Sequence, residues 1–337
     1  MNLTRQQLCV LQRIFETEKK KSCQCMYEDC TEKAIGSHVF SRSHILAPIS
    51  DLRNEIYVFE QRPLAYINEG VLRYKSRSIN NVFKFNGFCS KHDNDLFRDI
   101  EPAEGCVEWS NIRFQYLLSY RTLCREIYAN NVIQKTFGKY ISKYKDEANM
   151  CYYLLLFNEK LAQMERTKDT LMYYKDFLER GIDSCDYSDL SFEYIELPFQ
   201  LDLCVAAPVH VNDNQGACFN ADYQEINIVN VFPYYGKTII IIGYSKVFDN
   251  VWLNELLPKL KSPFPHIVSS AFTDILYRAE FHAMSFALYH SLDKDLLTYF
   301  LNSWLSEADN FSNDIEEVSS LFYLPLKEIM PESWKTL

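Results

Sequence analysis

Two stretches of the sequence decide how the N-terminal part of the chain folds: CQCMYEDC, residues 23–30, and FNGFCSKHDNDLF, residues 85–97. In the first stretch two cysteines are separated by four residues, and in the second a cysteine and a histidine are separated by two. Structural zinc sites use these spacings, because a short knuckle and the start of a helix can each place two ligands on one side of the metal. Three thiolates and one imidazole also suit Zn²⁺. The predicted ligands are Cys25, Cys30, Cys89 and His92.

Cys23 is an alternative to Cys25 as a ligand. We favour Cys25, because two cysteines separated by a single residue must bend tightly to share one metal. More residues separate the two ligand pairs than a minimal zinc finger uses, so a further segment is inserted between them. Residues 22–100 also contain few long apolar repeats. This composition predicts a small module that depends on a bound metal for its stability.

The overall composition is that of an ordinary globular protein, with 47% hydrophobic and 24% charged residues. No apolar run is long enough for a membrane span, and the N-terminus lacks the residue order of a signal peptide. We therefore expect a cytoplasmic protein without membrane contact. Most of the 11 cysteines are scattered singly, as buried thiols are in a reducing compartment, so no disulfide framework is expected.

The charge is unevenly distributed. Residues 1–100 carry 15 Lys and Arg against 12 Asp and Glu, whereas residues 101–337 carry 20 against 33. A polyanion should therefore meet the N-terminal part of the chain, and a protein partner could meet the acidic remainder. The basic segment RYKSRS, residues 73–78, is either part of a phosphate-binding surface or an ordinary solvated face.

Helical periodicity appears in three places before residue 190. Apolar residues at helical spacing over residues 3–20 predict a first amphipathic helix. Residues 112–137 and 150–181 are each long enough for a full helix, and the second is expected to end at Gly181. Two such consecutive helices are most simply paired antiparallel.

The pattern changes to strands after residue 190. Residues 192–211 and 225–245 are rich in β-branched and aromatic residues, and PYYGK, residues 233–237, predicts a hairpin turn. Residues 250–307 return to helical spacing, which includes His282 and His290 two helical turns apart. A core or capping role is expected for both histidines.

The segment AIGSHVFSRSHIL, residues 34–46, lies between the two ligand pairs. A knuckle, then a histidine on a β-like segment eight residues on, then Asn-Gly followed by Cys-x-x-His at a helix start resembles the HNH, or His–metal-finger, nucleases. These enzymes are built on a treble-clef-like ββα core. The resemblance covers residues 23–100. The pattern SH…SRS…GFC..HD..LF is also similar to that of certain bacterial proteins, which implies a link with phage defence.

The HNH resemblance implies roles for individual residues. His38 would be the general base that takes a proton from the attacking water. Asn86 would fix the loop that orients this histidine. His92 would be the final histidine of the pattern, which binds a catalytic Mg²⁺ or Mn²⁺ in that family.

Two features depart from the family pattern. Ser37 precedes the base where the family often has an acidic metal ligand, and a hydroxyl offers no charged oxygen to a hard cation. His92 is also predicted as a ligand of two different metals, zinc from the cysteine–histidine spacing and the catalytic ion from the family resemblance. We favour His92 on zinc, in which case Asp93 or Asp95 could supply the missing carboxylate.

Other basic and histidine residues near the pattern are secondary candidates. His44 is either a second site residue or structural. Arg42 could bind a phosphate with two parallel hydrogen bonds. The predicted nucleic-acid-binding residues are Arg42, Arg73, Lys75 and Arg77.

The sequence as a whole predicts an α+β protein. We expect an N-terminal helix over residues 1–21, a zinc-binding, treble-clef or HNH-like module over residues 22–104, and a larger helix–antiparallel sheet–helix domain over residues 105–337. The predicted function is that of a metal-dependent HNH-like nuclease, or a nucleic-acid-binding protein derived from one, which would meet DNA or RNA through residues 22–104. The alternative is a non-catalytic interaction protein in which zinc only shapes the fold.

Overall fold

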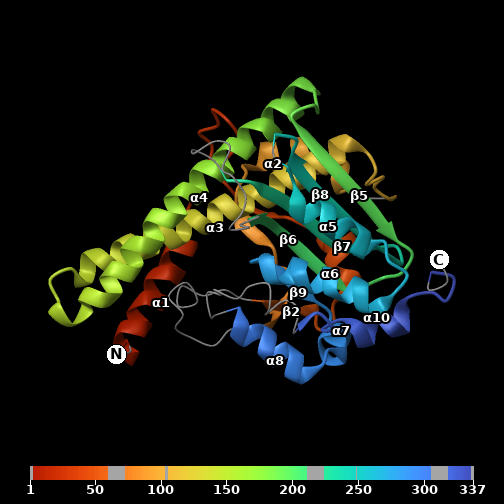
Figure 1. Cartoon of the computed structure of the whole chain (residues 1–337). Helices are drawn as coiled ribbons and strands as arrows, with labels where there is room; N and C mark the ends of the chain where they lie inside the picture. Colours follow the sequence, from red (N-terminus) through yellow and green to blue (C-terminus); the bar gives the residue numbers. More distant parts are fainter. Residues whose placement is uncertain are drawn as a thin grey trace.

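The protein is a mixed structure of helices and antiparallel sheet, as expected (Figure 1). The computed structural model describes residues 3–59, 73–102, 105–210, 224–247, 249–304 and 318–334. No helix in these ranges is long and apolar enough to cross a membrane.

A seven-stranded antiparallel sheet forms the centre of the described part of the molecule. Its strand order is β3-β2-β9-β6-β7-β8-β5. Strands from distant parts of the sequence are therefore neighbours, because β2 pairs with β9 on one side and with β3 on the other. The strands are β2 (Glu55–Phe59), β3 (Tyr74–Ser78), β5 (Leu190–Leu197), β6 (Leu203–His210), β7 (Ile226–Tyr234), β8 (Lys237–Ser245) and β9 (His282–Met284).

Both faces of this sheet are buried, which explains why β6, β7 and β8 read as nearly continuous apolar runs. Alternate residues point to opposite faces. Cys204, Ala206 and Ile228 pack with the long helices α3 (Ile112–Tyr144) and α4 (Cys151–Ser184). Val205, Ala207 and Val229 pack on the other face. That face is covered by helices including α5 (Val251–Leu260), α6 (Pro265–Arg278), α7 (Phe286–Ser291), α8 (Lys294–Ser303) and α10 (Tyr323–Ile329).

The two long helices pair as expected and extend beyond the sheet as an arm, with α1 (Arg5–Lys19) alongside (Figure 1). The expected end of α4 at Gly181 is wrong, because the helix continues to Ser184 and Cys185 takes the left-handed conformation, with φ 54°. Gly181 is instead a point of close packing. A Cβ on this residue would lie 2.6 Å from a ring carbon of Tyr116.

The hairpin between β7 and β8 is confirmed. Tyr235 and Gly236 both have positive φ values, 48° and 78°. These are the values of the two-residue turn that matches the twist of the flanking strands.

A second, two-stranded sheet holds the segment that resembles HNH nucleases. β1 (Gly36–His38) pairs antiparallel with β4 (Lys84–Asn86), and α2 (Ser90–Phe97) follows directly. A π-helical turn over Arg42–Leu46 follows β1. β2 and β3 lie between the two strands in sequence but belong to the large sheet. The sheet and its core therefore run across residue 104, where a domain boundary was expected.

The expected helical spacing of His282 and His290 is wrong, because residues 282–284 form the short strand β9. His282 is fully buried in the core, consistent with the core role expected for it, and its ring stacks on Phe59 with centroids 4.5 Å apart. Its Nδ1 contacts the carbonyl oxygen of Ala279 at 3.2 Å, and its Nε2 contacts the hydroxyl of Tyr74 at 2.6 Å. A carbonyl only accepts, so Nδ1 carries the proton of a neutral imidazole, and Nε2 accepts from Tyr74.

We predict that His282 makes folding sensitive to acid. Burial lowers the pKa of His282 to about 3, whereas an unfolded histidine titrates near pH 6.5. Below about pH 6.5 this histidine binds a proton in the unfolded chain but not in the folded chain, so the stability of the fold decreases as the pH falls. When the pH is lowered from 7.5 to 5.5, the titration of His282 should lower the free energy of unfolding by about 1 kcal/mol.

Urea unfolding of the parent protein and of His282→Asn at the two pH values measures this contribution. The variant should be less stable at both pH values but should lose less stability on acidification. The exposed His290 provides the control, and His290→Asn should keep the parent's pH dependence. An unchanged pH dependence in His282→Asn would show that its titration does not contribute.

Candidate metal centre and adjacent cleft

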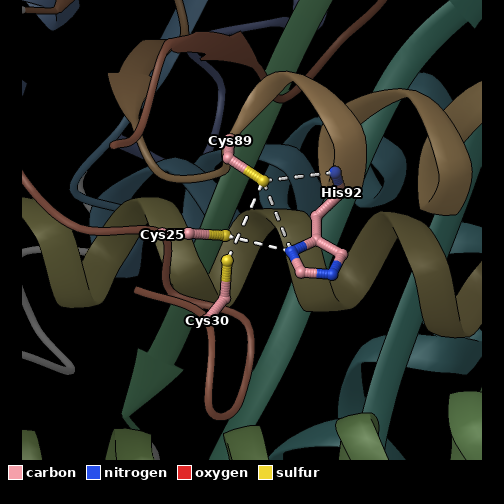
Figure 2. A group of neighbouring side chains, drawn as sticks. All are labelled: Cys25, Cys30, Cys89 and His92. Atoms are coloured by element: carbon pink, nitrogen blue, oxygen red, sulfur yellow. Dashed lines mark hydrogen bonds between the residues drawn. The ribbon is translucent and has the colours of Figure 1, made fainter. Parts of the chain in front are cut away.

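Four side chains from two distant stretches meet in one cluster (Figure 2). Their ligand atoms all lie within 4.8 Å of one another, and the cluster could bind a metal ion such as zinc. It is the only group of three or more such side chains within the described ranges. Its members are Cys25, Cys30, Cys89 and His92.

The distances within the cluster fit a tetrahedral zinc ion. Bonds of about 2.3 Å to sulfur and about 2.0 Å to nitrogen place two sulfurs roughly 3.8 Å apart, and a sulfur and a nitrogen roughly 3.5 Å apart. The Sγ atoms of Cys30 and Cys89 are 3.9 Å apart. The Nδ1 atom of His92 lies 3.4 Å from Sγ of Cys25 and 3.4 Å from Sγ of Cys89. The ligand set and its spacing are therefore those of a closed metal site.

The backbone explains why these residues converge. The first stretch folds back on itself, because the backbone N–H of Cys25 donates to the carbonyl of Glu32 at 2.8 Å and that of Cys30 to the carbonyl of Tyr27 at 3.2 Å. The N–H of Met26 donates to the carbonyl of Gly87 at 2.7 Å. This last bond holds the knuckle against the residues that lead into α2.

The helix α2 supplies the other two ligands from its first turn. Cys89 is its N-cap residue, and its Sγ accepts from the backbone N–H of His92 at 3.5 Å. Burial acts to raise the pKa of Cys89, but hydrogen bonds to the thiolate, the first from His92, lower it below its usual value. Burial raises the pKa of Cys25 to about 11. A bound cation would therefore be needed to keep Cys25 ionised at neutral pH.

The ring of Tyr27 covers His92, with ring centroids 4.4 Å apart. Its hydroxyl donates to Asp183 near the end of α4. Burial and the neighbouring Asp183 raise the pKa of Tyr27, so this tyrosine remains neutral. The tyrosine thus connects the knuckle both to a ligand and to the long helical hairpin.

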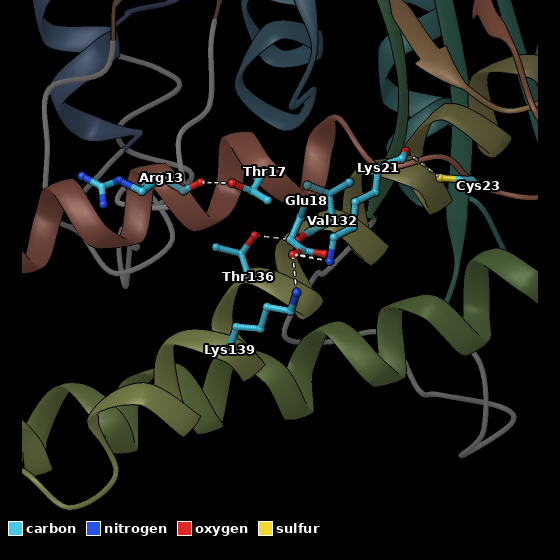
Figure 3. Close-up of polar contacts among 8 residues, drawn as sticks. All are labelled: Arg13, Thr17, Glu18, Lys21, Cys23, Val132, Thr136 and Lys139. Atoms are coloured by element: carbon cyan, nitrogen blue, oxygen red, sulfur yellow. Dashed lines mark hydrogen bonds and ion pairs between the residues drawn. The ribbon is translucent and has the colours of Figure 1, made fainter.

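Cys23, the alternative ligand, lies outside the cluster. Its Sγ contacts the backbone carbonyl of Lys21 at 3.7 Å (Figure 3). The preceding helix α1 is fixed on α3 by buried Glu18, which accepts from Lys21 at 2.8 Å and from Lys139 at 2.6 Å (Figure 3). The structure therefore places Cys25, and not Cys23, with the other three ligands.

A cleft of about 760 Å³ lies beside the cluster, on the other side of the first turn of α2. His38 from β1, His44 and Arg42 from the π-helical turn and Asp93 from α2 all line it. The helix brings the neighbours His92 and Asp93 to two different sites, because consecutive helical residues point about 100° apart.

His38 is oriented by the loop before β4. Its Nε2 lies 3.1 Å from the backbone carbonyl oxygen of Asn80. Since a carbonyl only accepts, Nε2 carries the proton of the neutral ring and Nδ1 keeps its lone pair. Burial lowers the pKa of His38, and the nearby cations Arg42 and Lys84 lower it further, although the bond to Asn80 opposes them. The imidazole is therefore neutral at pH 7 and able to accept a proton.

A buried arginine forms one wall of the cleft. Arg121 on α3 has a side chain only 1% exposed, and it donates to Asp93 at 3.2 Å and to Glu101 at 2.7 Å. Its guanidinium also lies over the ring of Phe97, 4.2 Å from the centroid. The two carboxylates of the cleft lining, Asp93 and Glu101, are thus already paired with a positive charge that comes from outside the N-terminal module.

The structure separates the remaining predicted site residues. Arg42 lies in the cleft and donates to the side-chain oxygen of Asn80 at 2.8 Å. Arg73, Lys75 and Arg77 lie at or on β3, the edge strand of the large sheet, and do not line the cleft. Asp95 on α2 is exposed and does not line the cleft. Asn86 faces Gly36 across the β1–β4 pair, and it is the backbone carbonyl of Asn80 that accepts from His38.

Sequence reasoning missed three residues of this site. Arg121 lies well beyond the zinc-like pattern in sequence, Glu101 follows shortly after the end of α2, and no local motif marks either residue. Lys84 lies directly opposite His38 in the antiparallel pair of β1 and β4. The register of these two strands fixes that position, and the sequence alone does not give the register. The comparisons with known proteins add no template for the site: no family model, no curated protein and no solved structure matches this chain.

We predict that removing one ligand of the cluster releases the metal. Cys30→Ser should reduce the metal content, measured by elemental analysis, from about one ion per chain to well below it, and should lower the melting temperature, because binding a structural metal is coupled to folding. Cys23→Ser is the matched control, since it removes a thiol of the same stretch that lies outside the cluster. Full metal occupancy in Cys30→Ser, or an equal loss in Cys23→Ser, would contradict the assignment.

Proposed function

We propose that residues 22–102 form a treble-clef zinc module of the HNH type, and that its cleft binds and cleaves the phosphodiester backbone of a nucleic acid. The observation that carries this proposal is the position of His38 and Asp93 in one cleft beside the Cys3His cluster. A knuckle, the antiparallel pair β1–β4 and helix α2 in that order are the parts of a treble clef. Zinc would hold the module together and would take no part in the reaction.

His38 is suited to act as the general base in this cleft. Its ring is neutral at pH 7, it is fixed through Nε2, and its Nδ1 lone pair can accept a proton from water. Arg42 would hold a phosphate oxygen near this histidine through its planar guanidinium. Asp93 and Glu101 supply carboxylate oxygens of the kind that bind Mg²⁺ or Mn²⁺. Such an ion, when bound, would stabilise the charge that develops on the phosphate oxygens.

A second function is favoured by one specific observation. Arg121 pairs with both carboxylates of the cleft, so a divalent cation would have to compete with a buried guanidinium for their oxygens. This arrangement suits a non-catalytic protein in which the zinc module is part of an interaction surface. A protein partner for the acidic C-terminal part of the chain, and the link with phage defence that the resemblance implies, stay predictions.

One variant separates the two functions. His38→Ala should abolish cleavage of plasmid and single-stranded DNA and RNA in the presence of Mg²⁺ or Mn²⁺, because the base is lost. Its metal content and melting temperature should stay close to those of the parent. His266→Ala, which removes an exposed histidine on α6, should leave cleavage unchanged.

Absence of cleavage together with a loss of stability would give an equally clear result. If the parent protein cleaves none of these substrates and His38→Ala lowers stability by about 1–3 kcal/mol, as loss of a half-buried hydrogen-bonded group would, then the histidine is structural. That result would reject the nuclease function and leave the interaction protein.

A further inference from the structure

We propose that Lys84 is a phosphate-binding residue of the cleft, and that Gly36 is present because it allows the side chain of Lys84 to lie across β1 into that cleft. This inference deepens the proposed function, on which it rests, by naming the group that the cleft recognises. Lys84 lies outside the set of basic residues that the sequence suggested.

The antiparallel register of β1 and β4 places Lys84 beside His38, the proposed base. His38 and Lys84 are directly opposite each other in the antiparallel pair, so their side chains leave the same face of the two strands. Gly36 lies two residues before His38 and therefore belongs to that same face. All three residues line the cleft.

The space above Gly36 is occupied by the end of the lysine side chain. A Cβ built on Gly36 would lie 2.2 Å from Cε and 3.1 Å from Nζ of Lys84. The glycine is not needed for its backbone, because its φ lies outside the positive range that side chains avoid. Its function is to permit this close approach. Any larger residue would force the ammonium group to a different position.

The charges of the cleft leave Lys84 available to an anion. Arg121 is already paired with two carboxylates, whereas Arg42 donates to the neutral amide of Asn80. The ammonium of Lys84 has no hydrogen bond or ion pair within the part of the chain that the structure describes. Arg42 and Lys84 therefore line the cleft together with His38, and neither has an acidic partner in the described part of the chain. A compact ammonium and a planar guanidinium in one cleft with a neutral imidazole suit a tetrahedral phosphate.

The lysine also explains part of the electrostatics of His38. Burial and the charges of Arg42 and Lys84 together keep the histidine in its neutral form. A phosphate bound by the two cations would thus share the cleft with a neutral imidazole. We infer that the phosphate is one of a nucleic-acid backbone and not a free phosphate, in keeping with the proposed function, because a cleft of about 760 Å³ has room for more than a single phosphate group.

The test measures binding separately from cleavage. Inorganic phosphate and a single-stranded oligonucleotide are titrated into the parent, and the ring-proton NMR signals of His38, assigned with His38→Ala, report binding in the cleft. Lys84→Gln should weaken binding of both probes at least about tenfold, as expected for the loss of one charge-assisted contact. It should also reduce the salt dependence of oligonucleotide binding by about one phosphate contact.

Gly36→Ala provides a second variant that keeps the lysine. Only the flexible end of Lys84 must move, so the fold, the metal content and the melting temperature should be preserved while binding falls as in Lys84→Gln. The double variant should bind both probes no more weakly than either single variant does. Lys33→Gln is the matched control, because it removes an exposed lysine of the same module that does not line the cleft, and it should bind as the parent does.

Each outcome decides the proposal. Parent-like binding in Lys84→Gln, no response of His38 to either probe in the parent, or parent-like binding in Gly36→Ala would overturn it. Phosphate binding that matches oligonucleotide binding in strength would assign the site to free phosphate and overturn the inferred substrate class. If the variants behave as expected but the parent cleaves no substrate, the phosphate site stands and the nuclease function alone fails.

Discussion

The first turn of α2 is the constraint on which the N-terminal half of this protein depends. Cys89 at its N-cap and His92 one turn later complete the Cys3His cluster. Asp93, the next residue, points into the cleft and is held by Arg121. A metal that fixes His92 therefore also fixes the direction of Asp93, because the two residues share one rigid helical turn. The cluster thus sets the geometry of the cleft without being part of it.

The same turn links the module to the remainder of the chain. Arg121 belongs to α3, and it pairs with Asp93 and with Glu101, one on α2 and the other beyond it. A buried arginine with two carboxylates is costly to disrupt, because removal of one partner leaves another charge unpaired. Together with the pairing of β2 and β9, this ion pair makes the module continuous with the large sheet. The cleft therefore exists only when both parts of the chain are folded together.

The Cys3His cluster, the first helix, the long helical hairpin and the strand hairpin could be predicted from the sequence, because each depends on spacing over a few residues. Cys25 and Cys30 are an example, since a knuckle is a local structure. Residues whose position depends on distant packing could not be predicted. The strand β9 is three residues long, which is too short to show an alternating pattern in the sequence. It is defined by its antiparallel pairing with β2 on one side and with β6 on the other. Arg121 carries no local signal, since its partners lie on another element.

The paired carboxylates limit how a divalent cation could enter this cleft. Asp93 and Glu101 already share the guanidinium of Arg121, which is buried and has no alternative carboxylate among its observed contacts. Mg²⁺ retains several water ligands and commonly binds through one or two carboxylates together with phosphate oxygens of the substrate. A cation that arrived alone would have to compete with the guanidinium for these carboxylate oxygens, whereas one that arrived with a phosphate bound by Arg42 and Lys84, as proposed above, would find additional oxygen ligands. If the cleft has the proposed function, this arrangement favours joint binding of cation and nucleic acid over a preformed ion site, and metal affinity should then depend on bound nucleic acid.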